Sequence, residues 1–257
     1  MKTIDILGYA VANETPARAA AEVAMSLSAE HPLQVTFLNP HSVAAARHDG
    51  EFRAAICSSQ LIFCDGSGLA LACRLLNHRR VERVYGYEFF LALSRELSER
   101  RTGRVMFLGG TSTVVEELLT RYRRDFPGIT AISAHCPPFR PSFSAEDISA
   151  IGELVRQFGP DVLWIGLGSP KQEKFMHLLR QVTSVPCTAA IGAVFDFYTG
   201  RVPHAPAWVR AAGLQWLHRL ILEPRRLWRR TFISGPRFAL VVLRQIALGA
   251  SGPPPNA

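Results

Sequence analysis

Short apolar runs alternate with amphipathic segments along the first two hundred residues. The apolar runs predict buried strands, which we expect at Ile4–Gly8, Val35–Leu38, Leu61–Cys64, Val105–Leu108, Ile129–Ser133, Val162–Gly166 and Thr188–Ile191. Between them, apolar positions recur at helical spacing, over approximately 15–30, 41–56, 68–77, 87–101, 112–124, 144–158 and 171–182. A strand followed by a helix at this spacing predicts an α/β fold built on a doubly wound, mostly parallel, Rossmann-like sheet.

The pattern changes near Gly200, where we place the one domain boundary. Residues 1–200 are expected to form the α/β domain, and residues 201–248 a basic, aromatic, helical C-terminal appendage. Residues 249–257 hold three consecutive prolines, and we expect them to be disordered.

Charge is distributed unevenly between these parts. Residues 1–200 carry 20 basic and 20 acidic side chains, whereas residues 201–257 carry nine arginines and a single acid, Glu223. The whole net charge of +8 therefore lies in the appendage. Arginine favours phosphates, because its planar guanidinium binds them bidentately and stays charged. Nucleic acid, an anionic membrane surface and a diphosphate substrate are the candidate partners.

Apolar residues in the appendage help to choose among these partners. Three of the four tryptophans of the chain lie here, interleaved with leucine and arginine, as is typical of a membrane interface. Arg237 and Arg244 bracket the most apolar run, so we expect the appendage to lie on a membrane without crossing it. The alternative is that these aromatic residues pack a terminal helix pair onto the domain. High apolar content and the lack of a recognised binding module argue against nucleic acid.

Cysteine usage and the N-terminus favour a cytoplasmic protein. The five cysteines form no Cys-x-x-Cys pair and are read as reduced thiols, and no apolar signal segment precedes the first strand. The sequence has no Asp-x-Asp, no His-Glu-x-x-His and no paired Cys or His spacing of a metal site. We expect no metal and no cofactor.

Polar and glycine residues follow four of the predicted strands. They are Asn39, the run Asp65–Gly68, the run Gly109–Thr111 and the run Gly168–Glu173. Because carboxyl ends of parallel strands meet at one edge, these loops should share a crevice that suits anions. In the last run, Lys171, Gln172 and Glu173 would place a cation, an amide and a carboxyl group at the mouth of this crevice.

Asp65 is the strongest candidate for a catalytic group. A carboxylate beside helix N-termini stays ionised and is able to accept a proton from a sugar hydroxyl. An aspartate between a strand and a helix is equally often an N-cap. Spacing alone leaves both interpretations open.

Taken together, the motifs resemble those of the WecG/TagA/CpsF glycosyltransferases, or glycosyltransferase family 26. The resemblance runs from about residue 4 to residue 232 and is carried by Asn39-Pro40, Asp65-Gly66-x-Gly68, Arg83-x-x-Gly86, Leu108-Gly109-Gly110, Gly166-Leu-Gly-Ser-Pro-Lys-Gln-Glu173, Gly192-Ala-x-Phe-Asp-Phe197, Ala205-Pro206 and Glu223-Pro-Arg-Arg-Leu-Trp-Arg229. It implies an inverting, metal-independent hexosyltransferase at the cytoplasmic membrane face. The donor would be a UDP-sugar and the acceptor a sugar on a polyprenyl diphosphate, in synthesis of an exopolysaccharide, a teichoic acid or a common antigen.

The resemblance also assigns expected roles to residues of this chain. Asp65 is the expected catalytic base. The expected donor-binding residues are Asn39, Gly66, Gly68, Gly109, Gly110, Gly168, Ser169, Gln172 and Glu173. The acceptor diphosphate or the membrane is expected to meet Arg83, Arg219, Arg225, Arg226 and Arg229. For Arg83, a surface ion pair with Glu82 or Glu88 is the alternative.

Departures from the family pattern leave the donor sugar open. Phe37 stands where many members carry threonine, His204 replaces the usual arginine before Ala-Pro, and Gln215 replaces the usual glutamate before Trp216.

Assembly into a homo-oligomer also stays open. Two other classes remain: a dinucleotide-dependent oxidoreductase, disfavoured because Gly166-Leu-Gly168 lacks the third glycine, and a non-catalytic membrane scaffold.

Overall fold

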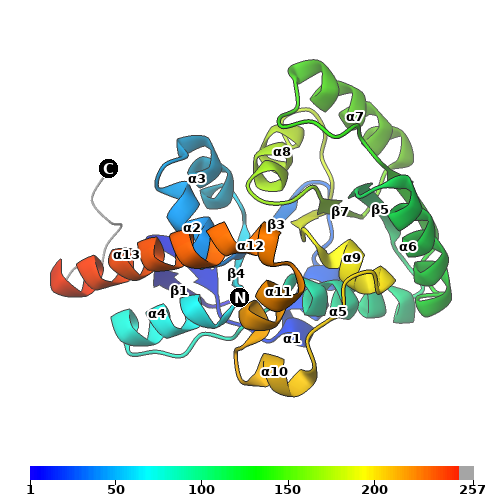
Figure 1. Ribbon diagram of the computed structural model, residues 1–257. Helices are drawn as coiled ribbons and strands as arrows, with labels where there is room; N and C mark the ends of the chain where they lie inside the picture. The colour runs from blue at the N-terminus through cyan, green and yellow to red at the C-terminus, as the bar shows by residue number, and fades with distance from the viewer. Residues whose placement is uncertain (249–257) are drawn as a thin grey trace.

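The computed structural model describes residues 1–248, apart from the side chains of residues 207, 211 and 226. Helices cover both faces of an eight-stranded sheet (Figure 1). Its strand order is β1 (Thr3–Ile6), β2 (Tyr9–Ala12), β4 (Leu61–Cys64), β3 (Leu33–Leu38), β8 (Cys187–Ala190), β7 (Val162–Gly166), β5 (Arg104–Gly109) and β6 (Ala131–His135). Every neighbouring pair is parallel except β1 with β2. The predicted α/β class and mostly parallel sheet are confirmed.

The edge of the sheet differs from the prediction. The single strand expected at Ile4–Gly8 is the first arm of a hairpin, in which β1 turns at Leu7 and Gly8 into β2. Both turn residues have positive φ, +57° and +83°, and Asp5 Oδ1 accepts a hydrogen bond from the Gly8 N–H at 3.1 Å. A two-residue turn of this hand usually carries Asn-Gly or Asp-Gly. Leucine at its first position hid the turn from sequence analysis.

Alternation along the strands divides the core between the two faces. Val105, Phe107 and Trp164 point to one face, and the residues between them point to the other. The first face is covered by α1 (Pro16–Met25), α5 (Gly86–Glu99), α6 (Ser112–Asp125) and α9 (Val194–Thr199). The second is covered by α2 (Pro40–Ala46), α3 (Gly50–Cys57), α4 (Ser67–Asn77), α7 (Ala145–Phe158), α8 (Lys171–Leu179) and a helix of the appendage. The segment 41–56, expected as one helix, is α2 and α3, because Asp49 caps a new helix by accepting from Phe52 N–H. The five cysteines are free.

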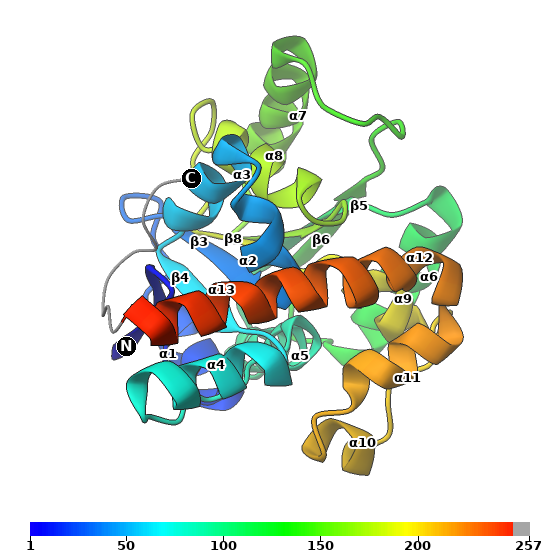
Figure 2. The ribbon, with the colours of Figure 1, turned by 60° about the vertical axis from the view of Figure 1, so that its left-hand side comes forward.

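The appendage is helical, as predicted. It comprises α10 (Ala207–Ala211), α11 (Gln215–Leu222), α12 (Pro224–Arg229), the π-helical turn η1 (Arg230–Ser234) and α13 (Gly235–Leu248). In both views α13 lies beside α4 and over α2 (Figures 1 and 2). Its inner face, Phe238, Val241 and Val242, joins the core cluster formed by those helices. The appendage is therefore packed onto the body through a buried apolar face.

Helices α12, η1 and α13 form one continuous helix. The expectation that no segment is long enough to cross a membrane was wrong in this respect. Residues Leu227–Leu248 are long and apolar enough to do so by length and composition alone, with a mean hydropathy of 1.2. The expectation rested on the run between Arg237 and Arg244, whereas this helix includes both arginines.

Gly109 marks the closest backbone approach at the strand ends. It has φ +113°, and a Cβ there would lie 2.5 Å from the Gly166 carbonyl oxygen on the neighbouring strand. We predict that Gly109→Ala lowers the free energy of unfolding by about 2–4 kcal/mol, through backbone strain and this clash. Gly50→Ala is the matched control, since no atom lies within 4 Å of its Cβ position. Equal urea midpoints for the two variants would contradict the account.

Candidate active site

Five neighbouring parallel strands end at one edge of the sheet. In the order β4, β3, β8, β7 and β5, they lead into Asp65, Asn39, Ile191-Gly192, Leu167-Gly168 and Gly110. The structure therefore brings the polar loops predicted from sequence to the same edge. Open α/β sheets bind ligands at this edge.

Asp65 is held at its backbone and flanked by an oriented amide. Its N–H donates to the Leu38 carbonyl oxygen at 2.8 Å. Asn39 Oδ1 accepts from Ser42 N–H at 3.1 Å and so caps α2. This cap leaves the Asn39 amide nitrogen to face the carboxyl group, and Nδ2 lies 3.5 Å from Asp65 Oδ2. The capped helix fixes which end of the amide meets Asp65.

The carboxyl group of Asp65 is not a helix cap. The N-cap of α4 is Gly66, at φ +96°, and no side chain caps this helix end. No atom lies within 4 Å of a Cβ position at Gly66, so the space beside it is open. At Gly68 a Cβ would instead lie 2.7 Å from Pro40 Cγ, which brings the first turns of α2 and α4 together. The free N-terminal amides of α4 thus face the same space as Asp65.

Charge from the appendage acts on Asp65. Burial raises the pKa of Asp65 above its ordinary value, whereas the positive charges of Arg230 and Arg219 and the hydrogen bond from Asn39 lower it. A carboxylate that is shielded from water and still ionised is a stronger base than one in solvent. The positive charges of the two arginines favour the ionised form of Asp65.

The glycine loop before α8 is closed by its own side chains. Gly168, at φ +79°, donates its N–H to Gln172 Oε1 at 3.2 Å, and Gln172 Nε2 donates to Glu173 Oε1 at 3.0 Å. Glu173 is 3% exposed. Among the described residues, neither its Oε2 nor the Ser169 hydroxyl has a hydrogen-bond partner at normal geometry, although Ser169 is near enough to lower the pKa of Glu173. Burial raises the pKa of Glu173, and the bond from Gln172 opposes this.

Lys171 does not lie at the mouth of the crevice, as we had expected. Its Nζ donates to the Arg140 carbonyl oxygen at 2.8 Å and sits over the Phe139 ring at 4.8 Å. The loop that precedes α7 therefore takes this cation away from the strand ends.

The appendage arginines separate into inner and outer groups. Arg219 pairs with Glu223 at 3.3 Å and lies over the Phe197 ring at 5.0 Å. Arg225 and Arg229 are exposed, and the side chain of Arg226 lies outside the described part of the chain.

Arg230 is the functional candidate that sequence analysis missed. Its charge lowers the pKa of both Asp65 and Glu173, so it lies near both carboxyl groups. It begins the π-helical turn η1. Ordinary helical spacing does not predict which way such a turn points its side chains.

Arg83 contacts the appendage. Its Nη1 lies 3.4 Å from the Cβ position of Gly213, and Ser67 Oγ donates to the Gly213 carbonyl oxygen at 2.9 Å. Glu88, one of the two expected ion-pair partners of Arg83, pairs with Arg210 at 3.6 Å instead. The loops around Asp65 and the start of α11 are therefore in direct contact.

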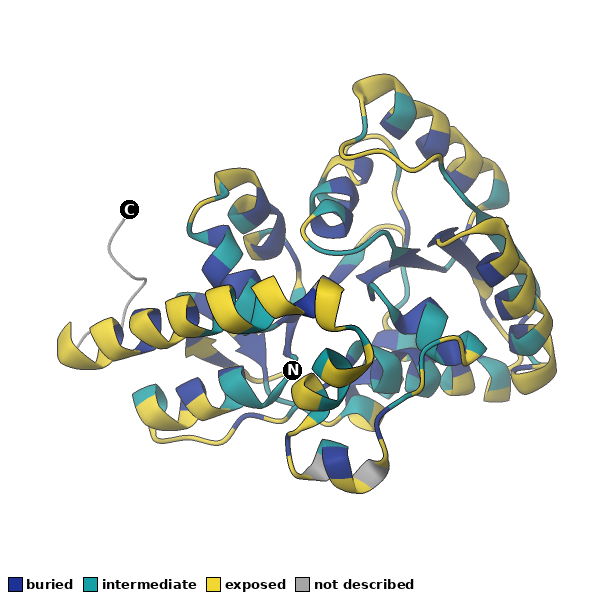
Figure 3. Cartoon of the chain, in the orientation of Figure 1, coloured by how far each residue is buried: buried dark blue, intermediate teal, exposed yellow. Residues whose placement is uncertain are grey.

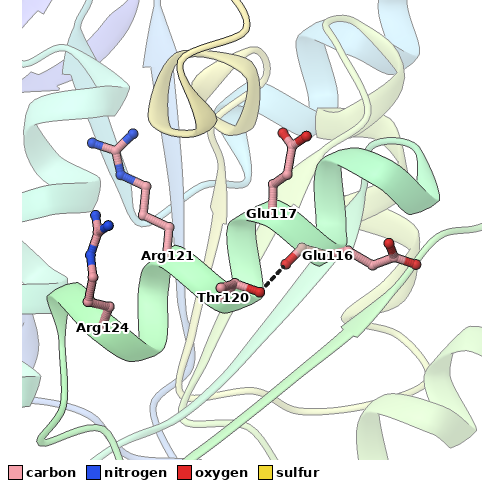
Figure 4. Close-up of a pocket in the computed structure, with 5 residues that line it drawn as sticks. All are labelled: Glu116, Glu117, Thr120, Arg121 and Arg124. Atoms are coloured by element: carbon pink, nitrogen blue, oxygen red, sulfur yellow. Dashed lines mark hydrogen bonds between the residues drawn. The ribbon is translucent and has the colours of Figure 1, made fainter.

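Two further observations concern ligands. A hollow of about 470 Å³ on the outer side of α6 is lined by Glu116, Glu117, Thr120, Arg121 and Arg124 (Figure 4). Its charges are largely paired, Glu117 with Arg201 and both arginines with Asp125, and we assign it no role.

No group of three or more His, Cys, Asp or Glu side chains able to hold a metal occurs in the part of the chain that the structure describes.

His41 fastens the appendage to the body. Its Nδ1 lies 2.8 Å from Ser234 Oγ of η1. Burial and the charge of Arg230 lower the pKa of His41 to about 4, from 6.5. Between those values an unfolded chain binds a proton that the folded chain does not, so stability falls as the pH drops from about 6.5 to about 4.

We predict that His41→Asn, which does not titrate, loses less stability than the wild type between pH 7.5 and pH 5. The difference should be on the order of 1 kcal/mol, after allowance for the partial exposure of the ring. Urea unfolding at the two pH values measures it. Identical losses would show that this histidine is not held neutral.

Comparison with known proteins explains why these strand-end loops and the appendage occur together in one chain. The sequence model described as the glycosyl transferase WecG/TagA/CpsF family matches residues 4–251. The N-acetylglucosaminyldiphosphoundecaprenol N-acetyl-beta-D-mannosaminyltransferase of Bacillus subtilis is 29% identical over 211 residues, 82% of this chain and 79% of the relative. The protein of the same name from Bacillus spizizenii is 29% identical over 206 residues, 80% and 77% of the two chains. The matched region includes every strand-end loop and the whole described appendage, and the chain belongs to the WecG/TagA/CpsF glycosyltransferase family.

Proposed function

We propose that the protein is an inverting, metal-independent glycosyltransferase that moves a hexosyl group from a UDP-sugar to a sugar on a polyprenyl diphosphate. The product would enter a bacterial cell-surface polysaccharide. The observation that carries the proposal is the shielded Asp65, flanked by Asn39 and by arginines of the appendage. The relatives support the acceptor class, because their names specify a sugar-diphosphoundecaprenol acceptor and a beta-linked product.

Inversion in one displacement needs a base on the side of the acceptor. The acceptor hydroxyl attacks the anomeric carbon opposite the departing UDP, and Asp65 takes its proton as the new bond forms. Asn39 holds the carboxyl group in place from the capped end of α2. Shielding from water raises the basicity of Asp65 at the moment when the proton moves.

The departing UDP needs stabilisation of its growing negative charge. We assign this to backbone N–H groups at Gly66, Gly68, Gly109 and Gly110, which lie along the shared strand edge. Gly168, whose N–H is bonded to Gln172, is assigned to shaping the donor loop. Ser169, Gln172 and Glu173 are the proposed partners of the donor sugar. With arginines available as counter-charges, the reaction requires no divalent cation.

The acceptor diphosphate is assigned to the inner arginines. Arg83 lies beside Gly213 of the appendage, and Arg219 lies near enough to Asp65 to lower its pKa. Arg225 and Arg229 are exposed and are assigned to membrane phosphates. The arginines of the appendage would thus bind two kinds of phosphate, the acceptor diphosphate and the phosphates of the membrane lipids.

The outer face of the appendage is the proposed membrane-docking surface. Exposed residues run along α12 and α13 (Figure 3). Large apolar side chains among them include Trp228 at 46%, Phe232 at 64% and Leu240 and Leu243 at 60% exposure. Aromatic and aliphatic groups next to arginine suit the headgroup boundary of an anionic bilayer. We infer a cytoplasmic enzyme, peripheral on the inner face of the cell membrane, whose lipid-linked acceptor lies in the same bilayer.

We predict that Asp65→Asn lowers the transfer rate by about 10²–10⁴-fold, because the amide cannot accept the proton. Mass spectrometry of the product, with a panel of UDP-hexoses, a polyprenyl-diphosphate sugar and EDTA, measures the rate. Asp5→Asn, in the edge hairpin, is the matched control and should retain full activity. An Asp65→Asn enzyme within a few fold of the wild type would exclude Asp65 as the base.

Membrane docking is tested separately with vesicles. We predict that the double change Trp228→Ser and Phe232→Ser lowers partitioning onto anionic phosphatidylglycerol vesicles by about tenfold or more, because two aromatic anchors are lost. Phe139→Ser removes an exposed ring from the loop between β6 and α7, outside the appendage, and should leave partitioning unchanged. Sedimentation with vesicles measures both, and equal losses in the two variants would refute the assignment.

A further inference from the structure

Unpartnered polar atoms gather in the first part of the appendage. In the part of the chain that the structure describes, seven buried side-chain N or O atoms have no hydrogen-bond partner. Four of them lie between residues 204 and 219: His204 Nε2, Gln215 Oε1, His218 Nδ1 and Arg219 Nε. Buried polar groups are nearly always paired, so a cluster of exceptions indicates a missing partner.

These atoms belong to one place in the fold. Gln215, His218 and Arg219 follow the spacing of a single face of α11. The His204 ring lies 4.4 Å from the Tyr87 ring and 5.5 Å from the Phe197 ring, and the Arg219 guanidinium lies over the same Phe197 at 5.0 Å. Phe197 thus connects the loop before α10 with the inner face of α11.

The cluster adjoins the catalytic carboxyl group. Arg219 is close enough to Asp65 to lower its pKa. Arg210, which holds His204, pairs with Glu88 at 3.6 Å, and Glu88 in turn interacts with the charge of Asp65. The donor-side unpartnered atoms, on Ser169 and Glu173, come from the loop after β7 instead. The two groups of unpartnered atoms come from different elements near Asp65, as expected of separate subsites for the sugar donor and the sugar acceptor.

The hydrogen-bonding character of His204 follows from its partner. Arg210 Nη1 lies 3.1 Å from His204 Nδ1, and a guanidinium only donates, so Nδ1 is the acceptor. Burial, Arg210 and His218 lower the pKa of His204 to about 4, which keeps the ring neutral. Its proton then resides on Nε2, the unpartnered atom. His204 therefore offers a donor, Gln215 Oε1 offers an acceptor, and the two are not bonded to each other.

We propose that His204 and Gln215 form the subsite for the acetamido group of the acceptor sugar, with Arg219 beside it. The sugar carbonyl oxygen accepts from His204 Nε2–H, and the sugar amide N–H donates to Gln215 Oε1. Arg219 Nε–H donates to a ring hydroxyl, and Tyr87 and Phe197 form the aromatic wall. The inference rests on the proposed function. Because these atoms are closed to solvent with the appendage docked, the sugar binds before the appendage closes over it.

The test uses two acceptor analogues that differ at one position. They are short-chain polyprenyl diphosphates carrying N-acetylglucosamine or glucose, the second with a hydroxyl in place of the acetamido group. We expect the wild type to prefer the first by about tenfold or more, both in kcat/KM for transfer and in Kd by calorimetry without donor. Gln215→Met and His204→Phe, which keep the shape of each side chain, should each reduce that ratio to within about threefold of unity.

The double variant sharpens the result. Since both side chains bind one group, its ratio should match that of either single variant rather than multiply their effects. Gln157→Met, at an exposed glutamine of α7, is the matched control and should keep the wild-type ratio. Equal affinity of the wild type for both analogues, or wild-type ratios in both single variants, would overturn the proposal. Absence of transfer to either analogue would reject the proposed function, while the Kd ratio still decides this inference.

Discussion

The interaction of the buried Asp65 carboxyl group with the arginines of the appendage is the one on which the rest of the structure depends. Burial alone would favour the protonated acid, which accepts no proton. Arg230 and Arg219 oppose this effect by lowering the pKa of Asp65, and both come from a segment more than 150 residues away in sequence. In the proposed mechanism, the folded appendage therefore favours the form of Asp65 that accepts the proton.

This coupling explains why so many contacts join the appendage to the body. Phe238, Val241 and Val242 extend the apolar core, Ser67 holds Gly213, and His41 meets Ser234. These contacts are made with α2 and α4, the helices that follow Asn39 and Asp65. The outer face of the same segment leaves its apolar and basic side chains exposed. In the proposal, one segment therefore completes the site with its inner face and meets the membrane with its outer face.

Much of the fold could be predicted, because parallel strands buried on both faces read as continuous apolar runs. Residues that follow such strands share an edge by topology, so Asn39, Asp65, Gly109 and Gly168 could be grouped without coordinates. The hairpin at Leu7-Gly8 could not, since its turn lacks the usual residues. Arg230 and His41 were missed for a different reason. Their roles depend on a π-helical turn and on a contact 193 residues apart in sequence, and neither leaves a local pattern. The prediction for Lys171 was wrong because its ammonium group donates to Arg140 in the loop before α7, a contact that leaves no local pattern in the sequence.

The most direct test of the coupling is the pH dependence of kcat/KM for transfer in Arg230→Met. Removing this positive charge takes away the strongest factor that lowers the pKa of Asp65. The acid limb of the profile should therefore move to higher pH, whatever happens to the maximal rate. Arg225→Met, which changes an exposed arginine of the neighbouring helix α12, should leave the limb where it is. An acid limb at the same pH in Arg230→Met as in the wild type would contradict the claim that the appendage sets the ionisation of the catalytic base.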